Sequence, residues 1–155
     1  MPYPIAKEFP VAPTKHALAA TLLAGASLVA GATDTNPLVA EQWRTRPLVV
    51  VVPSAQHPLL TGLQAQLRQA QWRGAFQERE MVLFTVIGGE GRRDGKPLSA
   101  AQTRGLLQSV NLKASSPATV FLIGKDGGIK LTEHGDHIAL APLFALIDTM
   151  PMRQR

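Results

Sequence analysis

The sequence predicts a single α/β domain with a mixed four-stranded sheet flanked by helices. Two apolar, largely β-branched runs, residues 48–52 (LVVVV) and 81–87 (MVLFTVI), have the pattern of strands covered on both faces. A segment with helical apolar spacing lies between them, as expected for two parallel strands joined by a crossover. Two further strands, 119–123 and 129–132, flank Lys125-Asp126-Gly127-Gly128, a strong hairpin signal.

The predicted helices each have a recognisable start or an apolar face. The first begins at Pro58, a residue suited to the first helical position, and we expect it to end near Gly74. Ser99 and Gln102 have the spacing of a capping box, which predicts a helix over residues 100–110. Leucine, phenylalanine and isoleucine residues at helical spacing predict the last helix over 139–150.

The resulting order of elements is βαβαββα. It contains two parallel steps through helices, then a hairpin and a packing helix. Right-handed crossovers place the first strand inside the sheet and the hairpin on the side opposite the second strand. Residues 90–96 (EGRRDGK) are expected to form a solvated loop, because they carry charges of both signs and two glycines.

The N-terminal residues 1–32 have the three parts of a secretory signal peptide. Lys15 precedes an apolar run that ends in Ala30-Gly31-Ala32, so we expect cleavage after Ala32. The run is rich in alanine and glycine and short for a membrane span, although an uncleaved anchor is the alternative. We therefore expect an exported protein, periplasmic or secreted, without a stable membrane span after cleavage. Residues 33–42 are expected to be a linker, and 43–155 the domain.

Composition excludes several classes of function. The 155 residues include no cysteine, which excludes thiol–disulfide exchange, thiol peroxidase activity and cysteine-ligated metals. The net charge is +5, but the basic residues are scattered and rarely accompanied by aromatic ones, so we expect no nucleic-acid partner. No motif indicates a cofactor.

Four segments carry a resemblance to a known family. They are WRTRPLVVVVPS, EREMVLF, FLIGKDGGIKL and LFALIDTMPMRQR, and they extend over most of the chain beyond Trp43. Through them the chain resembles the peroxiredoxin-like family of unknown function called P-DUDES. The resemblance implies a thioredoxin-like fold without an established enzymatic activity.

The resemblance also implies where a functional surface would lie. In redox-active relatives of this fold the cysteines occupy the turn after the first strand, which corresponds here to Ser54 through Leu59, and no cysteine is present there. A cis-proline faces that turn in the fold, and Pro117 is the candidate. In this fold the same surface accommodates extended peptides.

Ser54, Gln56 and His57 form the first candidate site, together with Pro117. A helix N-terminus presents N–H groups and positive potential, which favours an anion or a peptide ligand. Ser54 and His57 could also form a base-assisted nucleophile, although the residues assign no third, orienting group. The alternative without function is that Ser54 and His57 only cap the helix.

Glu133, His134, Asp136 and His137 form a second, weaker candidate site. Imidazole and carboxylate groups together bind zinc, copper or nickel, but three or four ligands must converge. The alternative is a polar connection between a strand and a helix.

The sequence therefore favours an exported, redox-inactive binding module with a protein or peptide partner, and enzymatic activity is not expected. Two alternatives stay open. One is a thiol-independent enzyme that uses Ser54 or His57, and the other is a structural protein whose basic surface contacts anionic envelope polymers.

Overall fold

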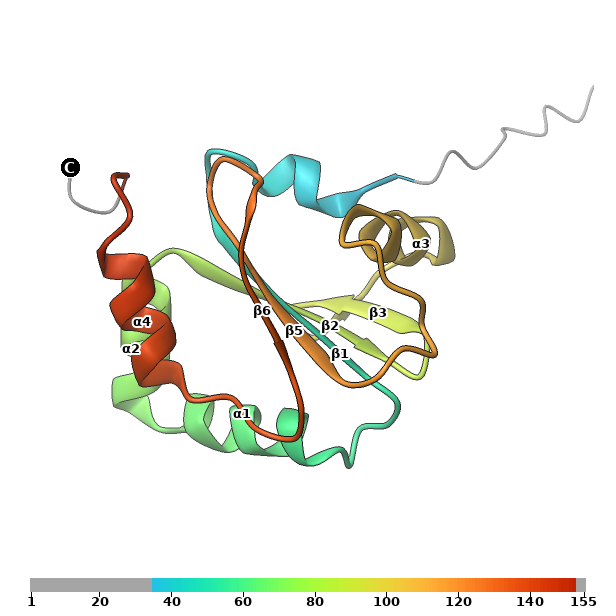
Figure 1. The fold of residues 1–155 in the computed structure, drawn as a ribbon, viewed down its shortest axis with the longest axis horizontal. Coiled ribbons are helices and arrows are strands. Elements are labelled where there is room, and N and C mark those ends of the chain that lie inside the picture. Colours follow the sequence, from blue (N-terminus) through green and yellow to red (C-terminus); the bar gives the residue numbers. More distant parts are fainter. Residues whose placement is uncertain (1–34, 153–155) are drawn as a thin grey trace, which may run out of the picture. The chain divides into compact units, whose positions relative to one another are not determined.

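The computed structural model describes residues 35–152, and the predicted signal peptide lies outside them. Within this range the strands form one six-stranded mixed sheet in the order β4-β3-β2-β1-β5-β6, accompanied by four α-helices and a short 3₁₀ helix (Figure 1). The elements are η1 (Pro37–Glu41), β1 (Arg46–Val52), α1 (Pro58–Arg68), α2 (Ala70–Glu78), β2 (Met81–Ile87), β3 (Glu90–Arg93), β4 (Lys96–Pro97), α3 (Ala100–Ser109), β5 (Thr119–Ile123), β6 (Ile129–His134) and α4 (Leu140–Asp148). No helix within this range is long and apolar enough to cross a membrane.

The predicted α/β class is confirmed, with β1 inside the sheet. All seven residues of β1 are buried, as its continuous apolar run predicted. Alternate side chains of the strand face opposite sides. Leu48 and Val50 pack in one cluster with side chains of α1 and α4, whereas Val49 and Val51 pack in another with α3. Figure 1 shows α1, α2 and α4 on one side of the sheet and α3 on the other.

The sheet has six strands, so the expectation of four was wrong. The expected loop 90–96 is instead the β3–β4 hairpin, which pairs antiparallel with the edge of β2. Gly88 and Gly89 both have positive φ, as do Asp94 and Gly95, and this conformation suits two-residue hairpin turns. Because β3 is short, with three charged residues and two exposed ones among its four, it lacks the apolar alternation that predicts a strand.

The direction of β5 also differs from the expectation. β1 pairs parallel with β2, but β5 runs antiparallel to β1, so the second helical connection is not a parallel step. The β3–β4 hairpin returns the chain to the end of the sheet where β1 ends, and β5 starts from that end with Thr119 opposite Val51. The β5–β6 hairpin lies on the side opposite β2, as predicted.

The helix predicted to end near Gly74 is two helices. Gln69 has an extended conformation between α1 and α2, and Gly74 lies inside α2 instead of capping a helix. The break turns α2 toward α4, where the Trp72 and Phe144 ring centroids are 6.0 Å apart. Helix α3 begins with the predicted capping box, in which both Ser99–Gln102 hydrogen bonds are present.

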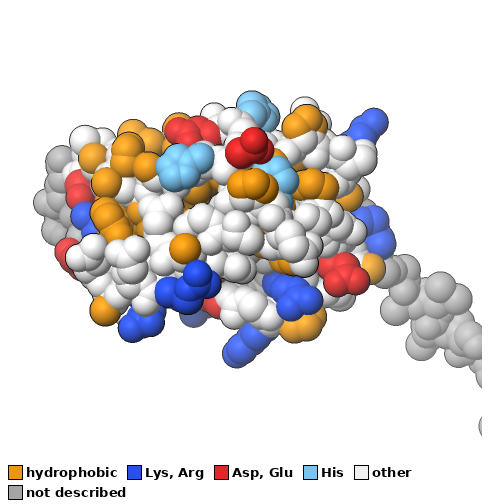
Figure 2. All heavy atoms as spheres, turned by 90° about the horizontal axis from the view of Figure 1, so that it is seen from below, with side chains coloured by type: hydrophobic (Ala, Val, Ile, Leu, Met, Phe, Trp, Pro, Cys, Tyr) orange, Lys and Arg blue, Asp and Glu red, His pale blue; other side chains and the backbone are white. Residues whose placement is uncertain are grey.

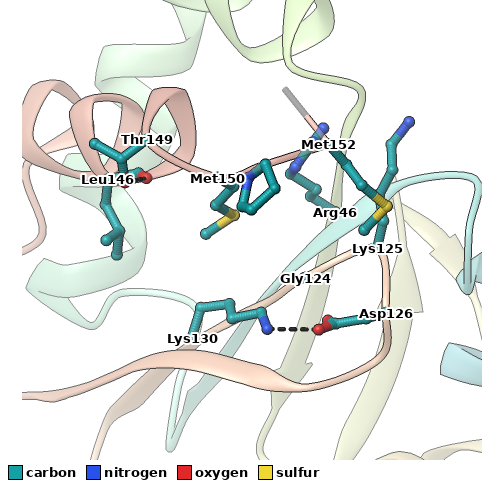
Figure 3. Close-up of a pocket in the computed structure, with 10 residues that line it drawn as sticks. Arg46, Gly124, Lys125, Asp126, Lys130, Leu146, Thr149, Met150 and Met152 are labelled. Carbon is teal, nitrogen blue, oxygen red and sulfur yellow. Dashed lines mark hydrogen bonds and ion pairs between the residues drawn. The ribbon is translucent and has the colours of Figure 1, made fainter. Parts of the chain in front are cut away.

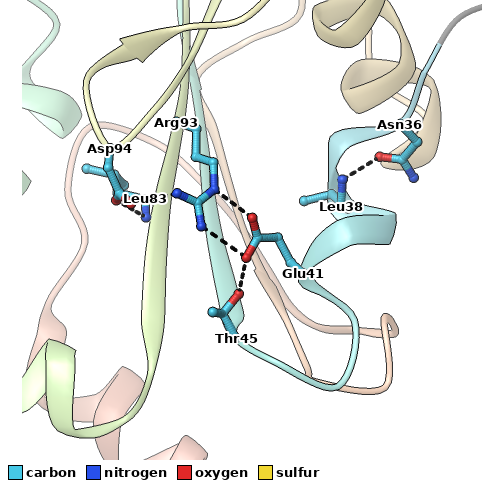
Figure 4. Close-up of polar contacts among 7 residues, drawn as sticks. All are labelled: Asn36, Leu38, Glu41, Thr45, Leu83, Arg93 and Asp94. Atoms are coloured by element: carbon cyan, nitrogen blue, oxygen red, sulfur yellow. Dashed lines mark hydrogen bonds and ion pairs between the residues drawn. The ribbon is translucent and has the colours of Figure 1, made fainter.

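Residues 37–41, expected as part of a linker, form η1 and are fixed to the sheet. Glu41 is only 5% exposed and accepts hydrogen bonds from Arg93 Nε to Oε1 at 2.6 Å and from Arg93 Nη2 to Oε2 at 3.2 Å (Figure 4). The Thr45 hydroxyl donates to Oε2 at 2.6 Å, and the Asn36 side chain caps the helix by accepting from Leu38 N–H. The segment is therefore part of the folded domain.

Candidate functional site

The corner between β1 and α1 is built as a helix cap. His57 is the N-cap of α1, and its Nδ1 accepts a hydrogen bond from the Leu59 N–H at 3.3 Å. Pro58 occupies the first helical position, as predicted. Ser54 contributes through its carbonyl, which accepts from the His57 N–H at 3.2 Å. Gln56 is exposed at the tip of the corner.

The second nitrogen of His57 faces a carboxylate. Nε2 lies 3.4 Å from Oδ1 of Asp136, and the His57 side chain is 16% exposed. Because Nδ1 accepts from Leu59, the neutral ring carries its proton on Nε2 and directs it to Asp136. Both nitrogens of His57 are thus engaged, and the ring has no lone pair to activate the Ser54 hydroxyl.

Pro117 lies beside this corner. The pairing of Val51 with Thr119 sets the residues before β5 next to those after β1. The Thr119 hydroxyl donates to the Pro117 carbonyl at 2.8 Å and lies 3.0 Å from His134 Nδ1. Since a hydroxyl has one proton, His134 Nδ1 is the donor in the second contact. No peptide bond in residues 35–152 is cis, so the cis conformation implied for Pro117 is absent.

The four candidate metal ligands do not form a ligand set. Glu133 and His134 are neighbours in β6, and neighbouring strand residues point to opposite faces. His134 contacts Thr119 and Asp136 contacts His57, so two of the four bind different partners. Among residues 35–152 no group of three histidine or acidic side chains converges to hold a metal. Figure 2 shows histidine and acidic side chains near one another on this face, with most of the lysine and arginine side chains away from them.

Gln66 ties the segment after β6 to helix α1. Its Nε2 donates to the Ile138 carbonyl at 2.8 Å, and its Oε1 accepts from the Leu140 N–H at 3.1 Å. The second bond satisfies one of the N–H groups at the start of α4, where Ala139 offers no side-chain cap. Together with the His57–Asp136 contact, it holds the β6–α4 connection in place.

A pocket that the sequence did not predict lies between the β5–β6 turn and the end of α4. We call it the lysine pocket, and its volume is about 450 Å³. Figure 3 shows Lys130 and Asp126 on one side and residues of α4 and the segment after it on the other. The lining residues are Arg46, Gly124, Lys125, Asp126, Lys130, Leu146, Thr149, Met150, Pro151 and Met152.

Ion pairs organise the cations of the lysine pocket. Lys130 Nζ lies 2.6 Å from Oδ2 of Asp126, and Lys125 pairs with Glu80. Arg46, whose side chain is 1% exposed, is 3.7 Å from Glu80 and donates to the Arg79 carbonyl at 2.9 Å. The hydrogen bond from Lys130, aided by the Gly128 N–H, lowers the pKa of Asp126 below its ordinary value of 3.8. Asp126 is therefore ionised at neutral pH.

A second pocket continues along the same helix. It has a volume of about 310 Å³ and is lined by Leu131, Glu133, His137, Ile138, Ala139, Pro142, Leu143 and Leu146. Leu146 lines both pockets. We call this second hollow the His137 pocket, and the two together the α4 groove. Only Glu133 and His137 of the groove belong to the candidate sites predicted from the sequence.

Residues 37–155 match a family described as a domain of unknown function, DUF4174. The match fits the expected domain of unknown function, and it carries no evidence for or against the peroxiredoxin-like resemblance. No curated protein sequence and no solved structure gives a significant match to the chain.

Proposed function

Since the chain belongs to the DUF4174 family, whose function is unknown, we propose from its own geometry that it is an exported, redox-inactive binding module. The absence of cysteine supports the redox-inactive part, because the fold holds no thiol to oxidise. The signal-peptide pattern of residues 1–32 supports export. The partner we propose is a polypeptide segment in extended conformation.

The domain is proposed to be a thioredoxin-like variant extended by the β3–β4 hairpin. Four strands in the order β2-β1-β5-β6, with a parallel β1–β2 pair joined through helices, support this. The corner at Ser54 follows β1 and precedes a helix, as the thiol-bearing turn does in the fold that the resemblance implies. The trans bond before Pro117 and the additional strands count as departures.

Binding is favoured over catalysis because of how His57 is bonded. A serine nucleophile requires a base with an acceptor nitrogen directed at its hydroxyl. His57 instead accepts a backbone N–H through Nδ1 and faces Asp136 through Nε2. The third, orienting group that the sequence could not assign is Asp136. It orients His57 as a helix cap and not as a base.

The observation that carries the proposal is the α4 groove. Apolar side chains line both of its pockets, cations gather at the lysine pocket, and Glu133 and His137 lie at the other. Concave surfaces with an apolar floor and a few polar groups are typical of binding sites. Two pockets that share Leu146 suit an extended segment that occupies both better than a compact ligand that fills one.

Site-specific photo-crosslinking in the native cell envelope tests this function. A photoreactive residue replaces Glu133 in the groove, Gln56 at the corner, or Gln108 on α3 as the control on the other side of the sheet. We expect polypeptide adducts at Glu133 and none at Gln108. Adducts at Gln56 alone would move the partner to the corner, and no adducts at any position would refute a stable polypeptide partner. N-terminal mass analysis of the same samples tests cleavage after Ala32.

The enzymatic alternative has its own test. A broad screen of hydrolase substrates is run with the full chain and with Ser54→Ala. A turnover that Ser54→Ala abolishes, with the fold retained, would overturn the binding-only function. We expect no such turnover.

A further inference from the structure

The lysine pocket has two chemically different walls. On the strand side, Lys130 brings its ammonium group to Asp126 at the β5–β6 turn, and Lys125 directs its ammonium group to Glu80. On the helix side, Leu146, Met150 and Met152 present apolar side chains, and methionine adapts to varied shapes. Figure 3 shows Lys130 and Asp126 on one side of the pocket and Leu146 and Met150 on the other. A ligand that fills it needs an anionic group and an apolar group close together.

The ion pair of Lys130 leaves room for one more anionic contact. Lys130 pairs with Asp126, whereas Lys125 and Arg46 lie against Glu80. An ammonium group has three N–H donors. Lys130 directs one donor at Asp126 and keeps capacity for a second acceptor. A carboxylate can therefore contact Lys130 without displacing its ion pair with Asp126.

A β-bulge directs Lys130 into this pocket. Leu122 pairs with Leu131 whereas Ile123 pairs with Ile129, so Lys130 is the additional residue on β6. A bulge re-aims side chains out of the usual alternation, which explains why Lys130 and Leu131 both line the groove. Gly124 provides the space, since a Cβ there would lie only 2.6 Å from Asp126 Oδ1 and would also collide with Lys130. The pair is built into the hairpin.

The C-terminal residue of a polypeptide meets both requirements of the pocket. Its carboxylate and its side chain branch from the same Cα, so an anion and an apolar group lie within one residue. An aspartate or glutamate inside a chain carries its carboxylate at the tip of the side chain, away from an apolar group. The β5–β6 turn also lines this end of the groove, which suits a chain that ends there.

We propose that the lysine pocket binds the C-terminal carboxylate of a polypeptide whose last side chain is apolar. This inference rests on the proposed function, because it places the end of the proposed extended segment. The carboxylate contacts Lys130, and the last side chain packs on Leu146 and Met150. The residues before the C-terminus then extend toward the His137 pocket, so the N-to-C direction of the segment is opposite to that of β6.

The test uses a defined peptide and its amide. Acetyl-threonyl-alanyl-threonyl-leucine, with a free carboxylate or as the C-terminal amide, is titrated into the isotope-labelled full chain and followed by NMR. We expect the acid to bind about tenfold more tightly than the amide, as a charge-assisted contact allows. Lys130→Gln is expected to remove this preference. Lys113→Gln, which changes the charge equally at an exposed residue outside the pocket, is expected to keep it.

The outcomes separate this inference from the function on which it rests. If acid and amide bind with equal affinity while crosslinks still form at Glu133, the carboxylate site is refuted and polypeptide binding in the α4 groove is retained. Equal weakening by Lys130→Gln and Lys113→Gln would overturn the site as non-specific charge attraction. Octanoate serves as a third probe. If it binds in a Lys130-dependent way while the peptide acid does not bind, the pocket takes a free carboxylate and the polypeptide terminus is refuted.

Discussion

Nε2 of His57 lies 3.4 Å from Oδ1 of Asp136, and this contact joins the β1–α1 corner to the connection between β6 and α4. The same histidine caps α1 through Nδ1. Two segments that the sequence suggested as separate sites are thus neighbours in the fold. Their shared role in the structure is to hold the corner and one end of the α4 groove together.

Replacing His57 should cost stability mainly through the lost cap. We expect His57→Ala to lower the free energy of unfolding by about 1 kcal/mol, the usual cost of losing an N-cap side chain. His57→Asn is the matched variant, because asparagine caps well, and it should retain most of the stability. Asp136 is 79% exposed, so Asp136→Asn should change stability by less than about 0.5 kcal/mol. Urea unfolding measures all three, and a larger loss for Asp136→Asn than for His57→Ala would contradict this.

Gln66 should matter more for the order of the groove than its surface position suggests. Gln66→Ala removes both bonds to the β6–α4 connection, and we expect a loss of about 1–3 kcal/mol. Gln66→Glu keeps an acceptor for Leu140 but has no donor for the Ile138 carbonyl, so its effect should be intermediate. Hydrogen exchange at the Leu140 amide is the direct measurement. If the exchange rate of the Leu140 amide is unchanged in Gln66→Ala, the two hydrogen bonds of Gln66 are not needed to hold the β6–α4 connection.

The buried strands and the capping box could be predicted because their signals are local. Residues 48–52 are apolar without interruption, and a strand covered on both faces requires this. Ser99 and Gln102 need only three residues of spacing to cap each other. The β3–β4 hairpin was missed because its pairing uses backbone groups and glycine turns, while its side chains are mostly charged and exposed.

The lysine pocket and the groove could not be predicted, because they depend on contacts between distant segments. Lys130 enters the pocket through a bulge that follows from pairing with β5. Met150 and Met152 follow α4, so the packing of this helix decides that they line the lysine pocket. The sequence placed His57 and Asp136 in separate candidate sites and could not predict their contact, because Asp136 lies on the β6–α4 connection.

The glycines of the helices should respond in opposite ways to alanine. A Cβ at Gly62 or Gly74 would meet nothing within 4 Å, so each substitution should raise the free energy of unfolding by about 0.4–1 kcal/mol. A Cβ at Gly105 would lie 2.7 Å from the backbone of Thr35, so Gly105→Ala should lower stability by about 1–3 kcal/mol. Thermal or urea unfolding tests the set. A stabilising Gly105→Ala would show that residues 35–36 are not held against α3.

The Glu41–Arg93 pair should make stability depend on acidic pH. Burial alone raises the pKa of Glu41, but the hydrogen bonds from Arg93 and Thr45 and the nearby positive charge outweigh it, so the pKa lies below its ordinary value of 4.5. A carboxylate with a lowered pKa in the folded state binds its proton more readily when unfolded. Its stabilising contribution is complete above pH 4.5 and is lost as the pH falls through the lowered value.

Glu41→Gln tests this dependence directly. The variant should lose about 1–3 kcal/mol at pH 7, because hydrogen bonds to a charged group are removed. Its free energy of unfolding should then fall less steeply than that of the parent chain as the pH drops below 4.5. Asp126→Asn is the matched control, since Asp126 also has a lowered pKa but its side chain is 40% exposed, and it should flatten the profile less. If both variants keep the parent slope between neutral and acidic pH, other carboxylates control acid unfolding and the buried pair does not anchor η1.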